Sequence, residues 1–84
     1  MKTIHKFPIN GSGIVMMPIK AKILSVQLQG GVICLWAEVD TNFDKEARHI
    51  LISGTGHRLD DFEEKTFIGT VQENGLVWHI FETL

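Results

Sequence analysis

The sequence predicts a small all-β domain, mainly antiparallel, with six or seven short strands arranged as a sandwich or barrel. Apolar and polar residues alternate with a period of two along most of the chain, and β-branched and aromatic residues are common in the same stretches. Turn-forming residues separate these stretches at intervals of about ten residues. The chain has 84 residues, which is the size of one domain, so we expect residues 1–84 to form a single unit.

The first half of the chain is expected to form four strands. They cover residues 4–9, 14–17, 22–29 and 32–39. The third stretch alternates clearly, with Leu24, Val26 and Leu28 on one face. Gly30-Gly31 separates it from the fourth, and two adjacent glycines suit a type I′ turn because both of its central residues need a positive φ. We therefore predict a hairpin whose second strand, apolar on both faces, is central in a sheet.

The second half is expected to form three more strands. They cover residues 46–53, 66–72 and 76–82. Asn74-Gly75 lies between the last two and is the second hairpin signal. The last strand is apolar enough on both faces for both to be covered. Between Gly54 and Lys65 the sequence is charged, and we expect at most one short helical turn there, near residues 59–64.

Composition excludes several classes of protein. A chain of 84 residues is too short for enzyme architectures that need a large scaffold, such as a TIM barrel or a full dinucleotide-binding fold. Eight Lys and Arg against ten Asp and Glu leave no positive excess, which argues against nucleic-acid binding. A single cysteine gives no disulfide framework, and no apolar stretch approaches the length of a membrane helix or a signal peptide. We expect a cytoplasmic protein without membrane contact.

Gly54, Thr55, Gly56 and His57 form the strongest candidate for a ligand site. A strand that runs into Gly-Thr-Gly can leave backbone N–H groups free to bind an anion, and Thr55 and His57 add a hydroxyl and a potential positive charge. The segment is not a P-loop, because the required Gly-Lys-Ser/Thr does not follow at the right spacing. The alternative is an ordinary tight turn whose glycines adopt positive φ.

The other candidates have simple structural interpretations beside the functional ones. Trp36 and Trp78 are either both core residues, or one is core and the other anchors an interface. The four histidines lack metal-binding spacing, so we expect no metal and no cofactor. The acidic residues in the range 60–64 either imitate nucleic-acid phosphates or form an ordinary charged loop. Cys34 lies in an apolar strand and reads as a small hydrophobic residue rather than a nucleophile.

Five segments of the chain resemble one known family. They are KTIHKFP (2–8), MPIKAKILSVQ (17–27), CLWAEVD (34–40), GTGH (54–57) and WHIFE (78–82). They occur in the family's order and extend over nearly the whole chain. The family consists of small proteins of unknown function encoded by tailed bacteriophages, prophages and their bacterial hosts. Its members commonly have Gly where this chain has Lys20, and often Pro where it has Arg58. The resemblance implies a phage setting and not an activity.

These observations leave three classes of function. The first is a binding module without catalysis, which attaches to a host protein or sequesters a small anionic ligand and thereby counters a host defence. The second is a structural or assembly role in the virion, because sheet edges invite pairing between copies. The third is a small enzyme that acts on a phosphorylated ligand at the Gly54–His57 turn. We favour the first, with the virion role second. Under both we expect a homo-oligomer, because a small domain gains stability by burying a second apolar face.

Overall fold

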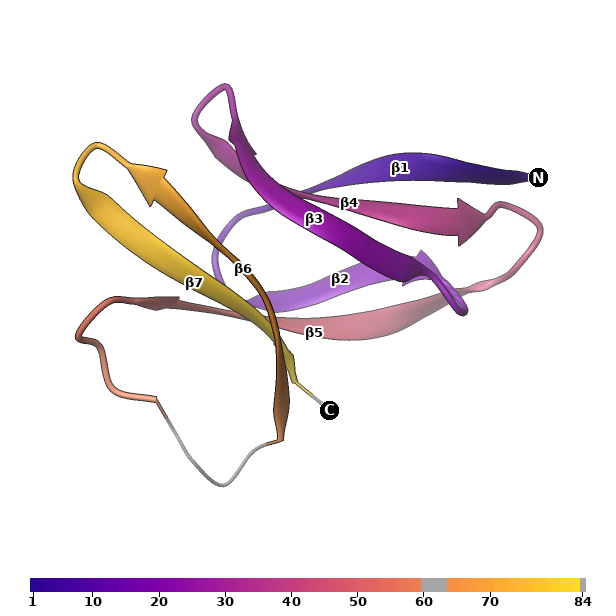
Figure 1. Ribbon diagram of the computed structural model, residues 1–84. Helices are drawn as coiled ribbons and strands as arrows, with labels where there is room; N and C mark the ends of the chain where they lie inside the picture. Colours follow the sequence, from indigo (N-terminus) through magenta and orange to yellow (C-terminus); the bar gives the residue numbers. More distant parts are fainter. Residues whose placement is uncertain (60–63, 84) are drawn as a thin grey trace.

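The computed structural model describes residues 1–59 and 64–83 as two antiparallel sheets packed face to face (Figure 1). Sheet A contains, in spatial order, β1 (Lys2–Ile9), β4 (Val32–Asp40) and β3 (Lys22–Gln29). Sheet B contains, in spatial order, β2 (Gly13–Pro18), β5 (Lys45–Gly54), β7 (Leu76–Thr83) and β6 (Lys65–Glu73). All strand pairs are antiparallel. The predicted all-β fold is confirmed, and of the two architectures left open the sandwich is the one observed.

The short helical turn expected near residues 59–64 falls largely on residues 60–63, which lie outside the described part of the chain. Within the described residues, no helix is long and apolar enough to cross a membrane.

Both predicted hairpin turns are confirmed by their backbone angles. Gly30 and Gly31, between β3 and β4, have φ values of 58° and 79°. Asn74 and Gly75, between β6 and β7, have φ values of 49° and 84°. These angles match the twist of the flanking strands, and glycine and asparagine are the residues that adopt them at least cost. The two turns therefore fix the register of the β3–β4 and β6–β7 hairpins.

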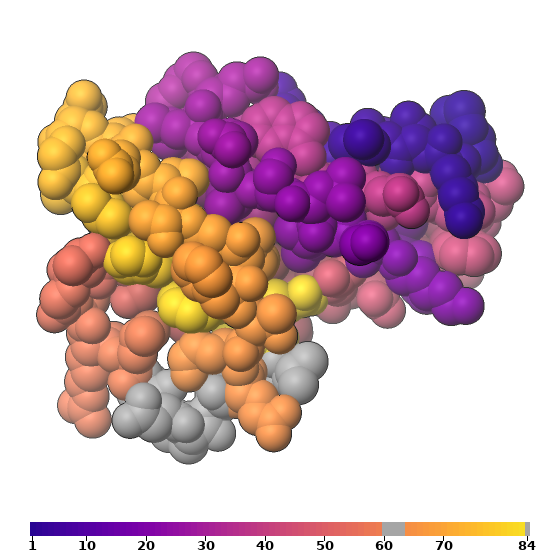
Figure 2. Space-filling model, in the orientation of Figure 1, coloured from indigo at the N-terminus to yellow at the C-terminus, as the bar shows by residue number. Residues whose placement is uncertain are grey.

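The two sheets meet along β3 and β6, which lie side by side (Figures 1 and 2). Each strand has an irregularity in its ladder, β3 between Ile23 and Ser25 and β6 between Phe67 and Gly69. Such bulges increase local twist and bend a strand. A Cβ atom at Gly69 would lie 2.7 Å from the side chain of Val26. The absence of a side chain at this position therefore allows β6 to approach β3 closely.

The core lies between the inner faces of the sheets and draws on both. Met17, Leu35 and Ile80 are fully buried at its centre. The other buried apolar side chains of the core are Ile9, Ala21, Val26, Ala37, Val39, Ile50 and Val71. In each strand these residues alternate with residues of the outer face, as the period-two pattern requires. The inner faces are thus closely similar in chemistry, and the sheets differ on their outer sides.

An ion pair closes one end of the sandwich. Arg48 on β5 donates two hydrogen bonds to Glu82 on β7, one of them from Nη2 to Oε1 at 2.9 Å. Its Nη1 donates to the carbonyl of Ala21, ahead of β3, at 2.9 Å. These hydrogen bonds to Glu82 raise the pKa of Arg48, against the opposing effect of partial burial. Arg48 therefore ties sheet B to the chain entering sheet A.

Candidate functional site

The outer face of sheet B carries a group of apolar side chains drawn from all four of its strands. The strand order β2-β5-β7-β6 and the register of its ladders place them on the same surface. We call this group the outer patch, and it consists of Ile14, Met16, Leu51, Phe67 and Phe81. The core residues of the same strands alternate with them and point inward. Sheet B is therefore apolar on both faces.

Three members of the outer patch are exposed to solvent, and Leu51 and Phe81 are half-buried. Ile14 is 61% exposed, Met16 50% and Phe67 57%. The rings of Phe67 and Phe81 lie edge to face with their centroids 5.5 Å apart, and Leu51 stands opposite Phe81 in the ladder. Single exposed apolar residues are ordinary on protein surfaces, whereas a contiguous group is typical of an interaction site. The arrangement has the chemistry of a surface that contacts another molecule.

Polar side chains near the outer patch are neutral or basic. By register, Lys45, His49 and His79 lie on the same face of sheet B. Among the described residues assigned to this face, none is Asp or Glu. Complementary charge steers association and disfavours wrong partners. The face therefore suits a partner that offers apolar residues bordered by carboxylates.

His79 is held by hydrogen bonds at one end of this face. Its Nε2 lies 2.7 Å from Thr55 Oγ1, and its Nδ1 lies 3.0 Å from Thr70 Oγ1. A hydroxyl can either donate or accept, so both ring nitrogens are satisfied. Both ring nitrogens of His79 are therefore engaged by hydroxyls of the chain itself. The network also links the turn after β5 to β6 and β7.

The predicted anion site, Gly54, Thr55, Gly56 and His57, forms the turn that follows β5. The N–H of Thr55 donates to the carbonyl of Val77 at 3.1 Å, and the N–H of His57 donates to the carbonyl of Gly54 at 3.0 Å. Gly56 adopts a φ of 85°, as expected of a glycine in a tight turn. Two backbone donors of the expected anion nest are therefore engaged within the chain. Anion binding at this turn stays a prediction.

The side chain of His57 lies over the end of β5. A Cβ atom at Gly54 would lie 2.8 Å from the His57 ring, so only glycine leaves room for it there. The ring also meets Trp78 edge to face, with centroids 6.2 Å apart. A hollow of about 300 Å³ borders these residues and the β6–β7 turn. The turn is thus packed against β7 as well as hydrogen-bonded to it.

The two tryptophans lie in different parts of the molecule. Trp78 is half-buried on the inner side of sheet B, where it packs against the core cluster. Trp36 is also half-buried, but by register it lies on the outer face of sheet A, opposite Lys6 and Ser25. Neither ring belongs to the outer patch. Their predicted role as interface anchors stays untested.

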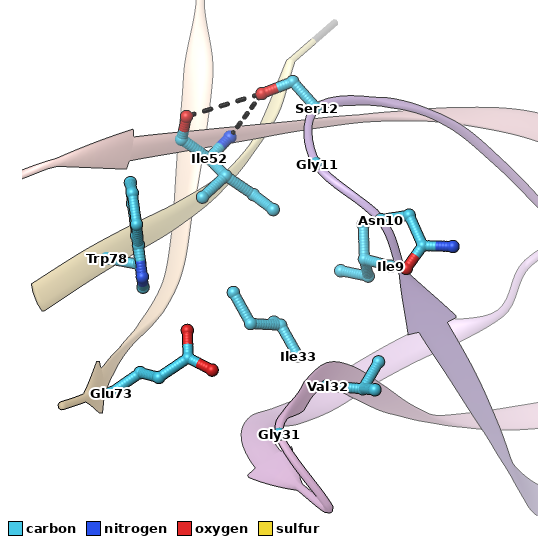
Figure 3. A pocket seen from close by; sticks show the side chains of 10 residues that line it. All are labelled: Ile9, Asn10, Gly11, Ser12, Gly31, Val32, Ile33, Ile52, Glu73 and Trp78. Atoms are coloured by element: carbon cyan, nitrogen blue, oxygen red, sulfur yellow. Dashed lines mark hydrogen bonds between the residues drawn. The ribbon is translucent and has the colours of Figure 1, made fainter. Parts of the chain in front are cut away.

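A cavity of about 350 Å³ opens at the end of the sandwich opposite the Arg48–Glu82 pair. Figure 1 shows the β3–β4 and β6–β7 hairpins diverging at this end. Ile9, Ile33, Ile52 and Trp78 form apolar walls, and Glu73 projects a carboxylate into the space (Figure 3). Ser12 borders the cavity and binds the backbone of Ile52, its Oγ accepting from the N–H at 2.9 Å. The cavity is therefore mostly apolar with one acidic group.

Sequence reasoning missed the outer patch as a unit. It identified β7 as apolar on both faces, which is part of the signal. The remaining residues come from β2, β5 and β6, and only the strand order brings them beside β7. As for metals, the described residues contain no group of three or more His, Cys, Asp or Glu side chains placed to hold an ion.

The chain matches a known domain family over its full length. The family is described as "Domain of unknown function (DUF7352)", and the match covers residues 1–84. No curated protein and no solved structure matches the chain. The chain belongs to the DUF7352 family of domains of unknown function.

Proposed function

We propose that the chain is a small binding module without catalytic activity, and that it attaches to another protein through the outer face of sheet B. The observation that carries this proposal is the outer patch, in which the exposed side chains of β2 and β6 share one face with the half-buried Leu51 and Phe81 of β5 and β7. Contact between exposed apolar area and water is unfavourable in free energy. A partner that covers this area removes that unfavourable contact.

The partner we propose is a different protein with an apolar surface bordered by Asp or Glu. Lys45 and His49 give the margin of the outer patch a basic character. A second copy of the chain would offer the same basic margin instead of carboxylates. Charge complementarity therefore favours a different protein over self-pairing.

Sequestration of a small anion at Gly54–His57 has less support. The N–H groups of Thr55 and His57 already bond to carbonyls of the chain. An anion there would have to depend on the His57 ring and on fewer backbone donors than a nest provides. Of the two binding roles, contact with another protein through the outer patch is therefore better supported than anion binding at Gly54–His57.

The resemblance to phage and prophage proteins suggests the setting. In that setting the chain is an accessory protein that acts in the cytoplasm of the host cell. Its partner is then a host protein, and one that takes part in host defence is the expected class. This setting rests on the resemblance alone.

The experiment compares two variants whose substituted residues are equally exposed in the free chain. A partner is captured from host extract, identified and purified, and the complex is rebuilt from the two pure proteins. Phe67→Lys changes the outer patch, and Ile4→Lys changes the outer face of sheet A, where Ile4 is also 57% exposed. We expect Phe67→Lys to weaken the dissociation constant at least about tenfold, because it places a charge in the interface. Ile4→Lys should leave it unchanged.

Equal effects of the two substitutions would contradict the proposal, as would failure of the pure proteins to form a complex. Sedimentation of the isolated chain, run at the same concentration, shows whether copies pair instead. Pairing abolished by Phe67→Lys would replace the proposed partner with a second copy.

A structural or assembly role in the virion is the second candidate. The observation that favours it is the free edge of β1, which pairs only with β4 within the described residues. An unpaired edge can add a strand from another copy. Mass spectrometry of purified particles distinguishes the two roles, because an accessory protein is absent from the virion.

A further inference from the structure

Two glutamates lie at opposite ends of the sandwich, and they differ in whether a positively charged side chain neutralises the carboxylate. Glu82, on β7, receives the hydrogen bonds of Arg48. Glu73, at the end of β6, is also only half-exposed. Within residues 1–59 and 64–83, no hydrogen bond or ion pair reaches its carboxylate. One end of the sandwich therefore holds a neutralised carboxylate, and the other holds a carboxylate without a counter-charge.

The surroundings of Glu73 are those of a ligand pocket. Its carboxylate points into the cavity of about 350 Å³, between Trp78 and Ile33 (Figure 3). Ile9 and Ile52 add apolar walls from β1 and β5. Small-molecule sites are mostly apolar concavities with a few convergent polar groups, and this volume lies near the lower end of their range. The pocket therefore has room for a short apolar chain.

The negative charge of Glu73 and the indole ring of Trp78 indicate which polar group a ligand of this pocket would carry. A carboxylate near apolar walls binds a cation through charge-assisted hydrogen bonds. An indole attracts a cation over its face, and Trp78 is seen nearly edge-on in Figure 3 with one face turned toward the cavity. A ligand carboxylate or phosphate would instead be repelled by Glu73.

We propose that this cavity, here called the Glu73 pocket, binds a primary ammonium group carried on a short apolar chain. The Glu73 carboxylate accepts hydrogen bonds from the ammonium, Trp78 lies beside the charge, and the isoleucines contact the chain. The pocket lies between the sheets, so it is separate from the outer patch and does not depend on the protein-binding proposal. A free alkylamine and a lysine side chain of another protein present the same chemistry.

The test uses three probes of equal chain length: hexylamine, hexanol and hexanoate. Binding is followed by the fluorescence of Trp78 in a Trp36→Phe background, where Trp78 is the remaining indole. We expect saturable binding of hexylamine, with affinity at least about tenfold higher than that of hexanol and no binding of hexanoate. N-acetyl-lysine methylamide is the fourth probe. Tighter binding of this probe than of hexylamine points to a protein lysine, and the reverse points to a free amine; both support the pocket.

Glu73→Gln keeps the shape of the side chain and removes its charge. It should lower the affinity for hexylamine at least about tenfold and leave that for hexanol unchanged. The matched control is Glu38→Gln, which removes a carboxylate on the outer face of sheet A. The proposal is overturned if hexanol binds as tightly as hexylamine, if Glu73→Gln has no effect, or if hexylamine gives no saturable change. Urea unfolding of each variant verifies that it is folded.

Discussion

The outer faces of the two sheets differ in how their apolar residues are covered. On sheet A, Lys6 on β1 reaches across β4 and donates from Nζ to Gln29 Oε1 on β3, at 2.7 Å. Cys34, on the β4 strand that this bond spans, is buried although it faces outward. On sheet B, polar side chains stand beside the outer patch and leave it open. The outer face of sheet A is thus mostly polar, although Ile4 and Val32 are exposed on it, whereas the outer face of sheet B carries apolar side chains from all four strands.

The largest losses of stability are expected from substitutions on the inner faces, where the two sheets are alike. Leu35 on sheet A and Ile80 on sheet B are both fully buried. Leu35→Ala and Ile80→Ala should each lower the free energy of unfolding by about 2–5 kcal/mol, because each leaves a cavity in a close-packed core. Urea denaturation measures this, with Ile4→Ala as the exposed control at less than about 0.5 kcal/mol. A cost as small as that of Ile4→Ala at either site would show that the inner faces are not equivalent.

Loss of the ion pair at the closed end should have the next largest effect. Arg48→Met leaves Glu82 half-buried without its partner, and both side chains retain some solvent contact, 16% and 21% exposed. We expect a loss of about 1–3 kcal/mol, less than for a fully buried pair. Combining it with Glu82→Met should recover part of this loss in a double-mutant cycle. An additive double variant would show that the pair is not coupled.

The β2–β3 turn, one of the connections between the two sheets, should respond to substitution in the opposite direction. Lys20, between β2 and β3, has a φ of 67°, a conformation that glycine adopts without strain. Lys20→Gly removes this strain but also the contact of its ammonium with the Phe43 ring, 5.9 Å from the centroid. The balance is a gain of about 0.5 kcal/mol in thermal or urea unfolding. Asn74→Gly is the control, expected to gain less because asparagine tolerates positive φ. A destabilised Lys20→Gly variant would mean that the ring contact outweighs the strain.

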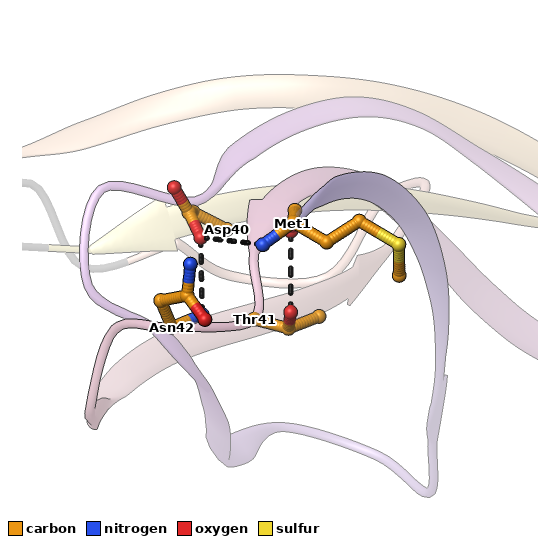
Figure 4. Close-up of polar contacts among 4 residues, drawn as sticks. All are labelled: Met1, Asp40, Thr41 and Asn42. Atoms are coloured by element: carbon orange, nitrogen blue, oxygen red, sulfur yellow. Dashed lines mark hydrogen bonds and ion pairs between the residues drawn. The ribbon is translucent and has the colours of Figure 1, made fainter.

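The smallest effect on stability concerns the carboxylate of Asp40, at the end of β4 (Figure 4). Asp40 accepts from the N–H of Asn42 at 3.0 Å and lies 3.3 Å from the amine of Met1. The backbone hydrogen bond, followed by the amine, lowers the pKa of Asp40 below its ordinary value of 3.8. A carboxyl with a lowered pKa stabilises the fold above that ordinary value, and the contribution is lost as the pH falls.

Asp40→Asn should therefore reduce the pH dependence of the free energy of unfolding in the acidic range. Between about pH 5 and about pH 2, the urea midpoint should fall slightly less for this variant than for the natural chain. Parallel curves for the two proteins would show that Asp40 makes no net contribution. Since Asp40 lies on sheet A, the variant should have no effect on binding at the outer patch.

The fold was predictable because its determinants are local. Period-two alternation defined the strands, and Gly30-Gly31 and Asn74-Gly75 marked turns that need positive φ. The sites were less predictable because they depend on strand order. Arg48 and Glu82 are 34 residues apart, and the Glu73 pocket joins residues from β1, β4, β5, β6 and β7. A single sequence indicates the face of a residue in a regular strand, but neither its neighbour across the sheet nor a bulge. Leu24 was expected on one face with Val26 and Leu28, and this was wrong, because it lies at the bulge in β3 and is 47% exposed.

The Gly54–His57 turn is a second case in which the local sequence was not sufficient to predict a site. Its composition indicates a backbone free to bind an anion. Its position beside β7 instead supplies Val77 as an acceptor for Thr55 and His79 as a partner for the Thr55 hydroxyl. A local motif therefore indicated which donors exist, and the tertiary pairing determined which are engaged.

Methionine oxidation tests the central claim most directly, because the chain contains its own controls. Met16 lies in the outer patch and is 50% exposed, Met1 is 69% exposed and precedes β1 on sheet A, and Met17 is fully buried. Mild peroxide converts exposed methionines to the sulfoxide, which mass spectrometry of peptides quantifies. In the reconstituted complex we expect Met16 to be protected while Met1 reacts as in the free chain. A complex in which Met1 is protected and Met16 oxidises at its free rate would contradict a binding surface on sheet B.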